Sequence, residues 1–169
     1  MTEAGPQRPK RLKLGSCDLP TLTVEAHYNP KEIDLGMQTG WKDEGAINGR
    51  VPRDDHDVID LEYTGSPARS MSLELLFDGV ETNQSIEPIV LQLKEMATPR
   101  DEQSTEAEWR RPHVCVVAWS ETDFPTFKCV IESLSVKYTM FSKEGRALRA
   151  TCSVKLKEVR LRWDLRGRR

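Results

Sequence analysis

The side chains that could catalyse a reaction or bind a metal are scattered along this chain. Its three histidines are His27, His56 and His113, and no HExxH motif occurs. The run 54–57, Asp-Asp-His-Asp, contains four potential metal ligands. Neighbours in sequence do not easily converge on one ion, so we interpret this run as a charged loop. The sequence also has no glycine-rich phosphate loop after a strand and no GxSxG nucleophile motif.

Carboxylates are plentiful, but they are not grouped with partners that would tune them for proton transfer. Asp101, Glu102, Glu106 and Glu108 lie in the polar stretch 99–111, which we expect to be a mobile surface loop. The four cysteines are Cys17, Cys115, Cys129 and Cys152, and none forms a CxxC pair. We interpret them as small buried apolar residues of a protein in a reducing compartment. We therefore expect no enzymatic activity, no cofactor and no metal site.

Composition excludes two further classes of protein. A net charge of −2 argues against a general nucleic-acid binder. The first ten residues have no apolar segment typical of a secretory signal, and no stretch approaches the roughly 18 apolar residues of a membrane helix. We expect a protein made and folded in the cytoplasm, without membrane insertion.

The 169 residues predict one domain with two basic tails. We expect a flexible basic arm at residues 1–13, a β domain at 14–159 and a basic tail at 160–169. In the tail, apolar residues alternate with arginines. Either it is a solvated tail, or it is a docking strand for another component. The residues expected to dock are Arg160, Arg162, Trp163 and Arg166.

The elements that must position any functional surface are mainly strands. Residues 133–140 and 148–157 alternate strictly between apolar and polar side chains, which predicts two strands that each have one apolar and one polar side. The segment 142–145 is expected to be the turn between them, with Gly145 at a positive φ. Between Ile131 and Leu134 the apolar parity changes from odd to even, which predicts a β-bulge near Glu132.

The remaining pattern adds further strands and one helix. We expect a strand over residues 22–28 and a hairpin of strands near 59–63 and 71–77 joined by the turn 64–67. We expect a long loop over 36–56, anchored by Trp41. Residues 113–119 are apolar on both parities, which favours a strand covered on both faces.

Apolar residues at helical spacing between Ile86 and Ala97, preceded by Ser85 as the cap, predict one helix. One helix cannot supply the crossovers of a parallel sheet. The predicted fold class is therefore mainly β: a tail-tube-like antiparallel β-sandwich or barrel with one packed α-helix and long loops.

In the order and spacing of several short motifs, the chain resembles the tube-type adaptors, or tube initiators, of contractile injection systems, including baseplate hub adaptors with a LysM module. The matching pieces are Tyr28-Asn29-Pro30, Trp41, the stretch 72–78, Glu87-Pro88-Ile89, Arg111-Pro112-His113, Ala118-Trp119 and above all 127–158, with Ser133 to Phe141, Gly145 and Arg149-Ala150-Thr151. Two departures are the absence of a LysM module after the domain and Cys129, where the family often has glycine.

The resemblance implies a structural protein of a phage-tail-like particle, in a ring between the trimeric spike hub and the hexameric inner tube. The implied partners are copies of the chain in a homohexamer, the hub protein and the tube protein, with a baseplate wedge or the sheath as further candidates. The particle would be assembled in the cytoplasm and could be released from the cell.

In such a ring we expect the polar side of the two long strands to face the lumen. The residues expected there are Ser135, Lys137, Thr139, Arg149, Thr151, Ser153 and Lys155. The channel would then have a basic lining, formed by the positively charged side chains of Lys137, Arg149, Lys155 and Lys157. Two alternatives stay open at this point. One is an inner tube subunit of the same kind of particle, and the other is a small-molecule or nucleic-acid binder that uses the β face.

Overall fold

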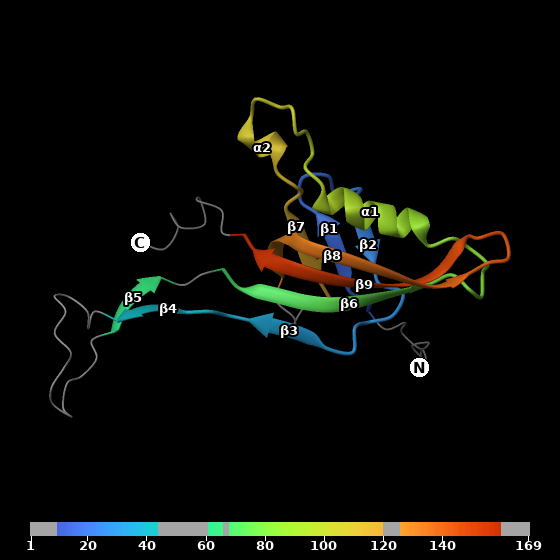
Figure 1. Cartoon of the computed structure of the whole chain (residues 1–169), viewed down its shortest axis with the longest axis horizontal. Coiled ribbons are helices and arrows are strands. Elements are labelled where there is room, and N and C mark those ends of the chain that lie inside the picture. The colour runs from blue at the N-terminus through green and yellow to red at the C-terminus, as the bar shows by residue number, and fades with distance from the viewer. Residues whose placement is uncertain (1–9, 44–60, 66–67, 120–125, 160–169) are drawn as a thin grey trace, which may run out of the picture.

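The computed structural model describes residues 10–43, 61–65, 68–119 and 126–159, and these form a seven-stranded antiparallel sheet, a two-stranded ribbon and two helices (Figure 1). The strands are β1 (Lys13–Ser16), β2 (Thr23–Glu25), β3 (Ile33–Gly36), β4 (Gly40–Asp43), β5 (Leu61–Gly65), β6 (Ser70–Asp78), β7 (Cys115–Ala118), β8 (Phe127–Phe141) and β9 (Ala147–Glu158); the helices are α1 (Glu87–Ala97) and α2 (Ala107–Arg110). The order in the large sheet is β2-β1-β7-β8-β9-β6-β3, and the sheet is not closed. The mainly β fold class is confirmed, and the arrangement is consistent with a β-sandwich.

The long hairpin of β8 and β9 is the central element of the sheet, as its alternating pattern predicts. Gly145 has a φ of 82°, and its amide donates to the carbonyl of Ser142 at 3.0 Å. The register between the two strands shifts between Ile131 and Ser133, so the bulge predicted near Glu132 is confirmed. The bulge allows the apolar residues on both sides of it to face the same core despite the change in parity.

Helix α1 covers the apolar side of the sheet and contacts β8 and β2. Its buried residues are Val90, Leu93 and Met96, with Ile86 directly before the helix. Of the predicted stripe, Ile89 and Ala97 are only partly buried, and at the last turn the core position is taken by Met96. Ser85 does receive a hydrogen bond from the amide of Glu87, at 3.3 Å, although Ile86 is the residue at the helix boundary.

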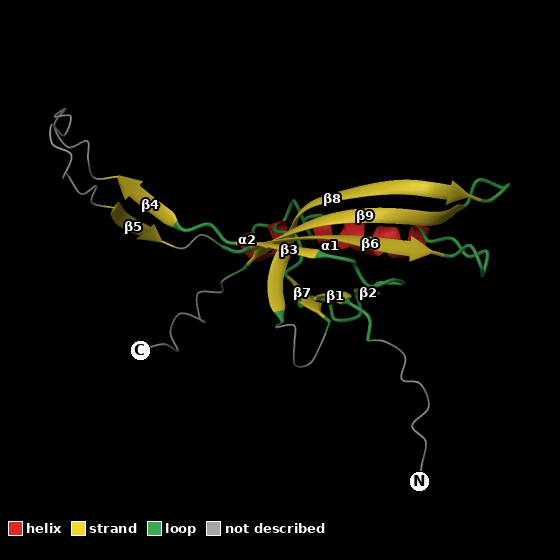
Figure 2. Cartoon of the chain, turned by 90° about the horizontal axis from the view of Figure 1, so that it is seen from below, coloured by secondary structure: helices red, strands yellow, loops and turns green. Residues whose placement is uncertain are grey.

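The predicted hairpin of residues 59–63 and 71–77 is wrong. Strand β5 pairs with β4, where Tyr63 lies opposite Trp41, and the two form a ribbon that projects from the body (Figure 2). Strand β6 lies instead between β3 and β9 and pairs with β9 over all nine of its residues. The turn residues at 64–67 favour a reversal, but the long apolar face of β6 is buried better against β9. Part of the expected 36–56 loop is therefore strand, and residues 44–60 lie outside the described part.

Two further expectations differ from the structure. In β7, Cys115 and Val117 are fully buried but Ala118 is exposed, so this strand is covered on one face only. The stretch 99–111 contains α2 and folds back on itself, with the amide of Asp101 donating to the carbonyl of Trp109 at 2.8 Å. At the N-terminal end, Leu12 is fully buried, and residues 1–9 of the expected arm lie outside the described part.

Candidate assembly surface

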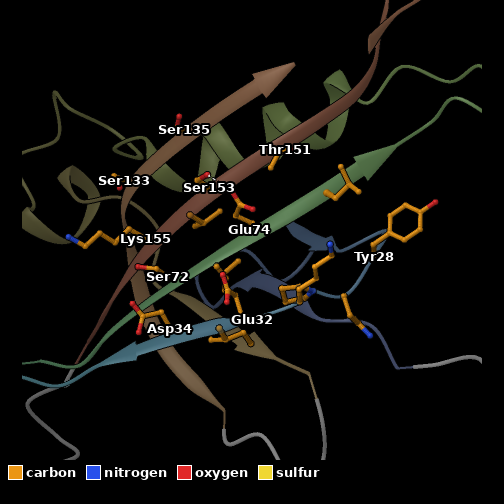
Figure 3. A pocket seen from close by; sticks show the side chains of 17 residues that line it. Tyr28, Glu32, Asp34, Ser72, Glu74, Ser133, Ser135, Thr151, Ser153 and Lys155 are labelled. Atoms are coloured by element: carbon orange, nitrogen blue, oxygen red, sulfur yellow. Dashed lines mark hydrogen bonds between the residues drawn. The ribbon is translucent and has the colours of Figure 1, made fainter. Parts of the chain in front are cut away.

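The polar sides of β3, β6, β9 and β8 form one continuous surface, which we call the polar face (Figure 3). Its residues lie in rows across the strands, because directly paired residues of antiparallel strands point to the same side. One row runs Asp34, Ser72, Lys155, Ser133, and the next runs Glu74, Ser153, Ser135. A third row joins Leu76, Thr151 and Lys137. Most of these side chains carry small hydroxyl groups or single charges.

The structure brings together the residues that the sequence analysis expects on one side of the long hairpin. Ser135, Lys137, Thr139, Ser153 and Lys155 are exposed, and Arg149 and Thr151 are partly exposed. Thr139 lies at a second register shift, between Tyr138 and Met140, and its hydroxyl reaches the carbonyl of Arg149 at 3.5 Å. The seven residues therefore share the polar face, and none of them lies in the core.

Sequence reasoning missed the contribution of β6 and β3 to this face. Ser72 and Glu74 alternate with buried apolar residues of β6, so their orientation could be inferred from the pattern. Their position beside β9, and that of Asp34 beside Ser72, depends on long-range pairing that the pattern does not encode.

The segment from Tyr28 to Asp34 forms one wall of a groove on the polar face. Its other walls are β6, β8 and β9, and its volume is about 1070 Å³. An isolated bridge pairs Tyr28 with Leu76, which ties the segment after β2 to β6. The labelled hydroxyl and charged side chains in Figure 3 surround this groove. It is open to solvent, and it does not have the enclosed form typical of a small-molecule site.

Ion pairs neutralise much of the positive charge on the polar face. Arg149 contacts Asp78 at 2.7 Å, and Lys155 and Lys157 contact Glu132 at 3.1 Å and 4.0 Å. The pKa of Asp78 lies below its ordinary value, because the Val80 amide and the Arg149 guanidinium donate to its carboxylate. This face of the single chain is therefore mixed in charge, and the basic lining of an assembled channel stays a prediction.

A second network fastens the stretch 99–114 to the N-terminal strands. The carboxylate of Asp18 accepts hydrogen bonds from Arg111 and from the amide of Val114, and it also pairs with Arg100 at 3.0 Å. These donors hold the pKa of Asp18 well below its ordinary value, with Arg111 making the largest contribution. Beside it, the buried side chains of Ser16 and His113 share a hydrogen bond of 2.8 Å.

Large apolar side chains are exposed at both ends of the long axis. On the β4–β5 ribbon, Trp41 and Tyr63 are 57% and 52% exposed, and their rings contact edge to face at 5.5 Å. Met37 is exposed on the connection that leads to the ribbon. At the opposite end, Met140 and Phe141 are exposed beside the turn of the long hairpin. A single two-stranded ribbon is marginally stable in water, which favours a partner for the aromatic pair.

The described residues contain no cluster of potential metal ligands. Among them, no three His, Cys, Asp or Glu side chains come together as metal ligands, and no buried polar side-chain atom lacks a hydrogen-bond partner. His27 bonds to the backbone of Asp78, and His113 bonds to Ser16. The run 54–57 and the expected docking residues Arg160, Arg162, Trp163 and Arg166 lie outside the described part. No helix of the described part is long and apolar enough to cross a membrane.

Comparison with known proteins yields one family. A family model described as contractile injection system tube protein matches residues 13–162, which include every described strand and both helices. No curated protein matches the chain.

Proposed function

Because the chain belongs to the contractile injection system tube protein family, we propose that it forms the adaptor ring that joins the spike hub of such a particle to its inner tube. Family membership makes it a structural component of a contractile injection particle that assembles with copies of itself. The position of the chain in the adaptor ring goes beyond what family membership gives. It is supported by the free edges of the sheet, by the polar face and by the two excursions from the body.

The observation that carries the proposal is the edge of β8. This strand has 15 residues, but β7 pairs only with residues 127–129 of it. Within the described part of the chain, no strand pairs with that edge of β8 over residues 130–141. Such a long row of open amide and carbonyl groups is a template for a strand of another chain. The strands β8, β9, β6 and β3 form a four-stranded wall, and among the described strands β3 pairs only with β6, so its other edge is free at the far end.

A ring follows if the β8 edge of one copy pairs with the β3 edge of the next. This contact is heterologous, and such contacts generate closed rings when the rotation between copies closes. The proposed ring is a homohexamer with the polar face toward its lumen. Ser135, Lys137, Thr139, Arg149, Thr151, Ser153 and Lys155 would then line the channel, with their charges largely balanced by Glu132 and Asp78.

Two segments that project from the sheet body, which we call the excursions, favour the adaptor over its alternative, an inner tube subunit. The β4–β5 ribbon and the stretch 99–112 both project from the sheet body. A ring that stacks uniformly on copies of itself has less use for such projections than a ring that meets different proteins above and below. The partners proposed are the spike hub and the inner tube protein, with a baseplate wedge or the sheath as further contacts. We propose the basic tail, residues 160–169, as a docking strand for one of them.

The proposed ring assembles in the cytoplasm and leaves the cell only with its particle. The polar face is mixed in charge, and Tyr28 is the one aromatic residue among those that line its groove, so the groove lacks the row of aromatic side chains on which successive bases stack. We therefore propose no nucleic-acid partner and no membrane insertion.

The mass of the native complex tests the proposal. The purified chain is measured alone, with the spike hub protein and with the tube protein. The adaptor predicts a closed ring of defined mass that binds both proteins. Open-ended tubes formed by the chain alone would establish the tube subunit instead, and a monomer in all three samples would contradict both.

Hydrogen exchange tests the free edge directly. In the monomer, the amides of β8 that point away from β9 should exchange rapidly beyond residue 130, and in the ring they should become protected. Strand β9, which lies between β8 and β6, is the matched control, because it should be protected in both states. Protection of β8 that does not change on assembly would exclude edge pairing while leaving the ring itself intact.

A further inference from the structure

Two of the four cysteines lie directly opposite each other. Cys115 on β7 pairs with Cys129 on β8, and both side chains are fully buried. Directly opposed residues of antiparallel strands have Cα atoms about 4.5–5.5 Å apart. Disulfides span Cα separations of about 4.4–6.8 Å. The backbone therefore already places this pair at a distance that a disulfide can bridge without moving the strands.

The other two cysteines do not share this arrangement. Cys152 is equally buried, but it lies opposite Val136 and Leu75. Cys17 is exposed and follows the last residue of β1. All four are free thiols in the structure. The opposed pair is thus a specific feature of two neighbouring strands and does not follow from the number of cysteines alone.

The pair lies at the short pairing between β7 and β8, which we call the seam. Strands β7 and β8 share only three residue pairs, whereas β6 and β9 share nine. The seam alone joins the unit β2-β1-β7 to the wall of β8, β9, β6 and β3 within the sheet. We propose that Cys115 and Cys129 are a reversible disulfide site, and that its oxidation closes the seam covalently.

The reaction is a thiol–disulfide exchange with a small-molecule disulfide such as oxidised glutathione. The thiolate of Cys115 attacks one sulfur, the S–S bond breaks and one glutathione leaves as its thiol. The thiolate of Cys129 then attacks the mixed disulfide and releases the second glutathione. The two protons from the protein thiols end on the two glutathione thiols, and the disulfide reagent takes up the two electrons.

Burial makes this exchange slow but does not prevent it. It raises the pKa of Cys115 to about 12 and that of Cys129 further, so few thiolates are present at neutral pH. Reaction then proceeds through local opening of the three-pair seam. The site stays reduced where the glutathione pool is reduced and closes in an oxidising medium.

The test uses the purified full-length chain and oxidised glutathione as the probe. One sample is oxidised in native buffer and one in urea below the unfolding transition, which opens the seam transiently. Intact mass and a non-reduced peptide map identify the bond. We expect a loss of two hydrogens, a linkage between the peptides of Cys115 and Cys129, and a thermal midpoint raised by about 5–10 °C.

Two variants make the result specific. In Cys152→Ala the bond and the shift in midpoint should persist, because the removed thiol has no cysteine opposite it. In Cys129→Ala both should vanish, and a mixed disulfide formed on Cys115 should persist, because no thiol lies opposite it to release the glutathione. The proposal is overturned if both thiols stay free in both samples, if the linkage joins other cysteines, or if the linked protein has an unchanged or lower midpoint.

Discussion

Asp18 and Arg111 face each other in a two-point ion pair although 93 positions separate them in the sequence. The guanidinium donates to both carboxylate oxygens, at 2.8 and 3.1 Å, and the side chain of Asp18 is only 17% exposed. Arg100 pairs with the same carboxylate. One aspartate therefore holds both ends of the excursion between α1 and β7 against the turn that follows β1.

The first prediction concerns Asp18→Asn. The substitution keeps the shape of the side chain but removes the charge that both arginines share, so the free energy of unfolding should fall by about 2 kcal/mol. Urea unfolding at neutral pH measures this. Asp34→Asn is the matched control, because Asp34 is exposed on β3, and it should change stability by less than about 0.5 kcal/mol.

The pH dependence of the same variant is the second prediction. The folded pKa of Asp18 lies below its unfolded value of 3.8, so the unfolded state binds more protons in the acid range. The stability that the pair contributes is present above pH 4 and is lost as pH falls through the folded pKa. The difference in unfolding free energy between the wild type and Asp18→Asn should therefore narrow below pH 4. A difference that stays constant through this range would contradict the ion-pair origin.

The third prediction compares two leucines of α1. Leu93 is fully buried against the sheet, whereas Leu91 is 54% exposed on the outer side of the same helix. Leu93→Ala should lower the free energy of unfolding by about 2–5 kcal/mol, because it leaves a cavity in the core. Leu91→Ala should change it by no more than about 0.5 kcal/mol. Equal losses at both sites would mean that α1 does not pack as described.

The fourth prediction concerns Tyr138, whose hydroxyl donates to Glu87 of α1 at 2.6 Å. This bond to the carboxylate raises the pKa of Tyr138 to about 12, so its phenol should titrate later than an ordinary tyrosine. In Tyr138→Phe the tyrosine signal that titrates at the highest pH should disappear from the ultraviolet titration. The free energy of unfolding at neutral pH should fall by about 1 kcal/mol. Because the folded pKa is raised, this contribution should decline above pH 10.

Local patterns predicted the parts of the fold that depend on neighbours in sequence. The β8–β9 hairpin, its turn at Gly145 and the bulge near Glu132 all follow from alternation over adjacent residues. The pairing of β6 with β9 could not be predicted in this way, because register between distant strands depends on which apolar faces meet in the folded core. Strand β3 was missed since its apolar residues, Ile33 and Leu35, lie on a short edge strand and are not fully buried.

The same limit applies to the candidate site. The seven polar residues of β8 and β9 could be found from their alternation, but the acidic residues that balance them could not. Asp78 belongs to a different strand from Arg149, and only the register of β6 with β9 brings them together.

The fifth prediction tests the orientation of the polar face in the proposed ring. In a Cys17→Ser background, Lys137→Cys places a thiol on the polar face, and Leu91→Cys places one on the outer face of α1. A maleimide too large to enter the channel should label Lys137→Cys in the monomer but not in the ring, and it should label Leu91→Cys in both. Equal labelling of both variants in the ring would contradict the lumenal assignment.

The free edge of β8 also determines how copies of this protein could add to one another. If β8 of each copy pairs with β3 of the next, an arc of any length still ends in one bare strand at each side. Each added copy pairs one exposed edge strand but contributes a new one, so an arc always has as many unpaired edges as a single copy. Only the closing step removes both unpaired edges. Assembly of this kind is cooperative: at equilibrium, single copies and complete rings predominate, and arcs of intermediate length are scarce.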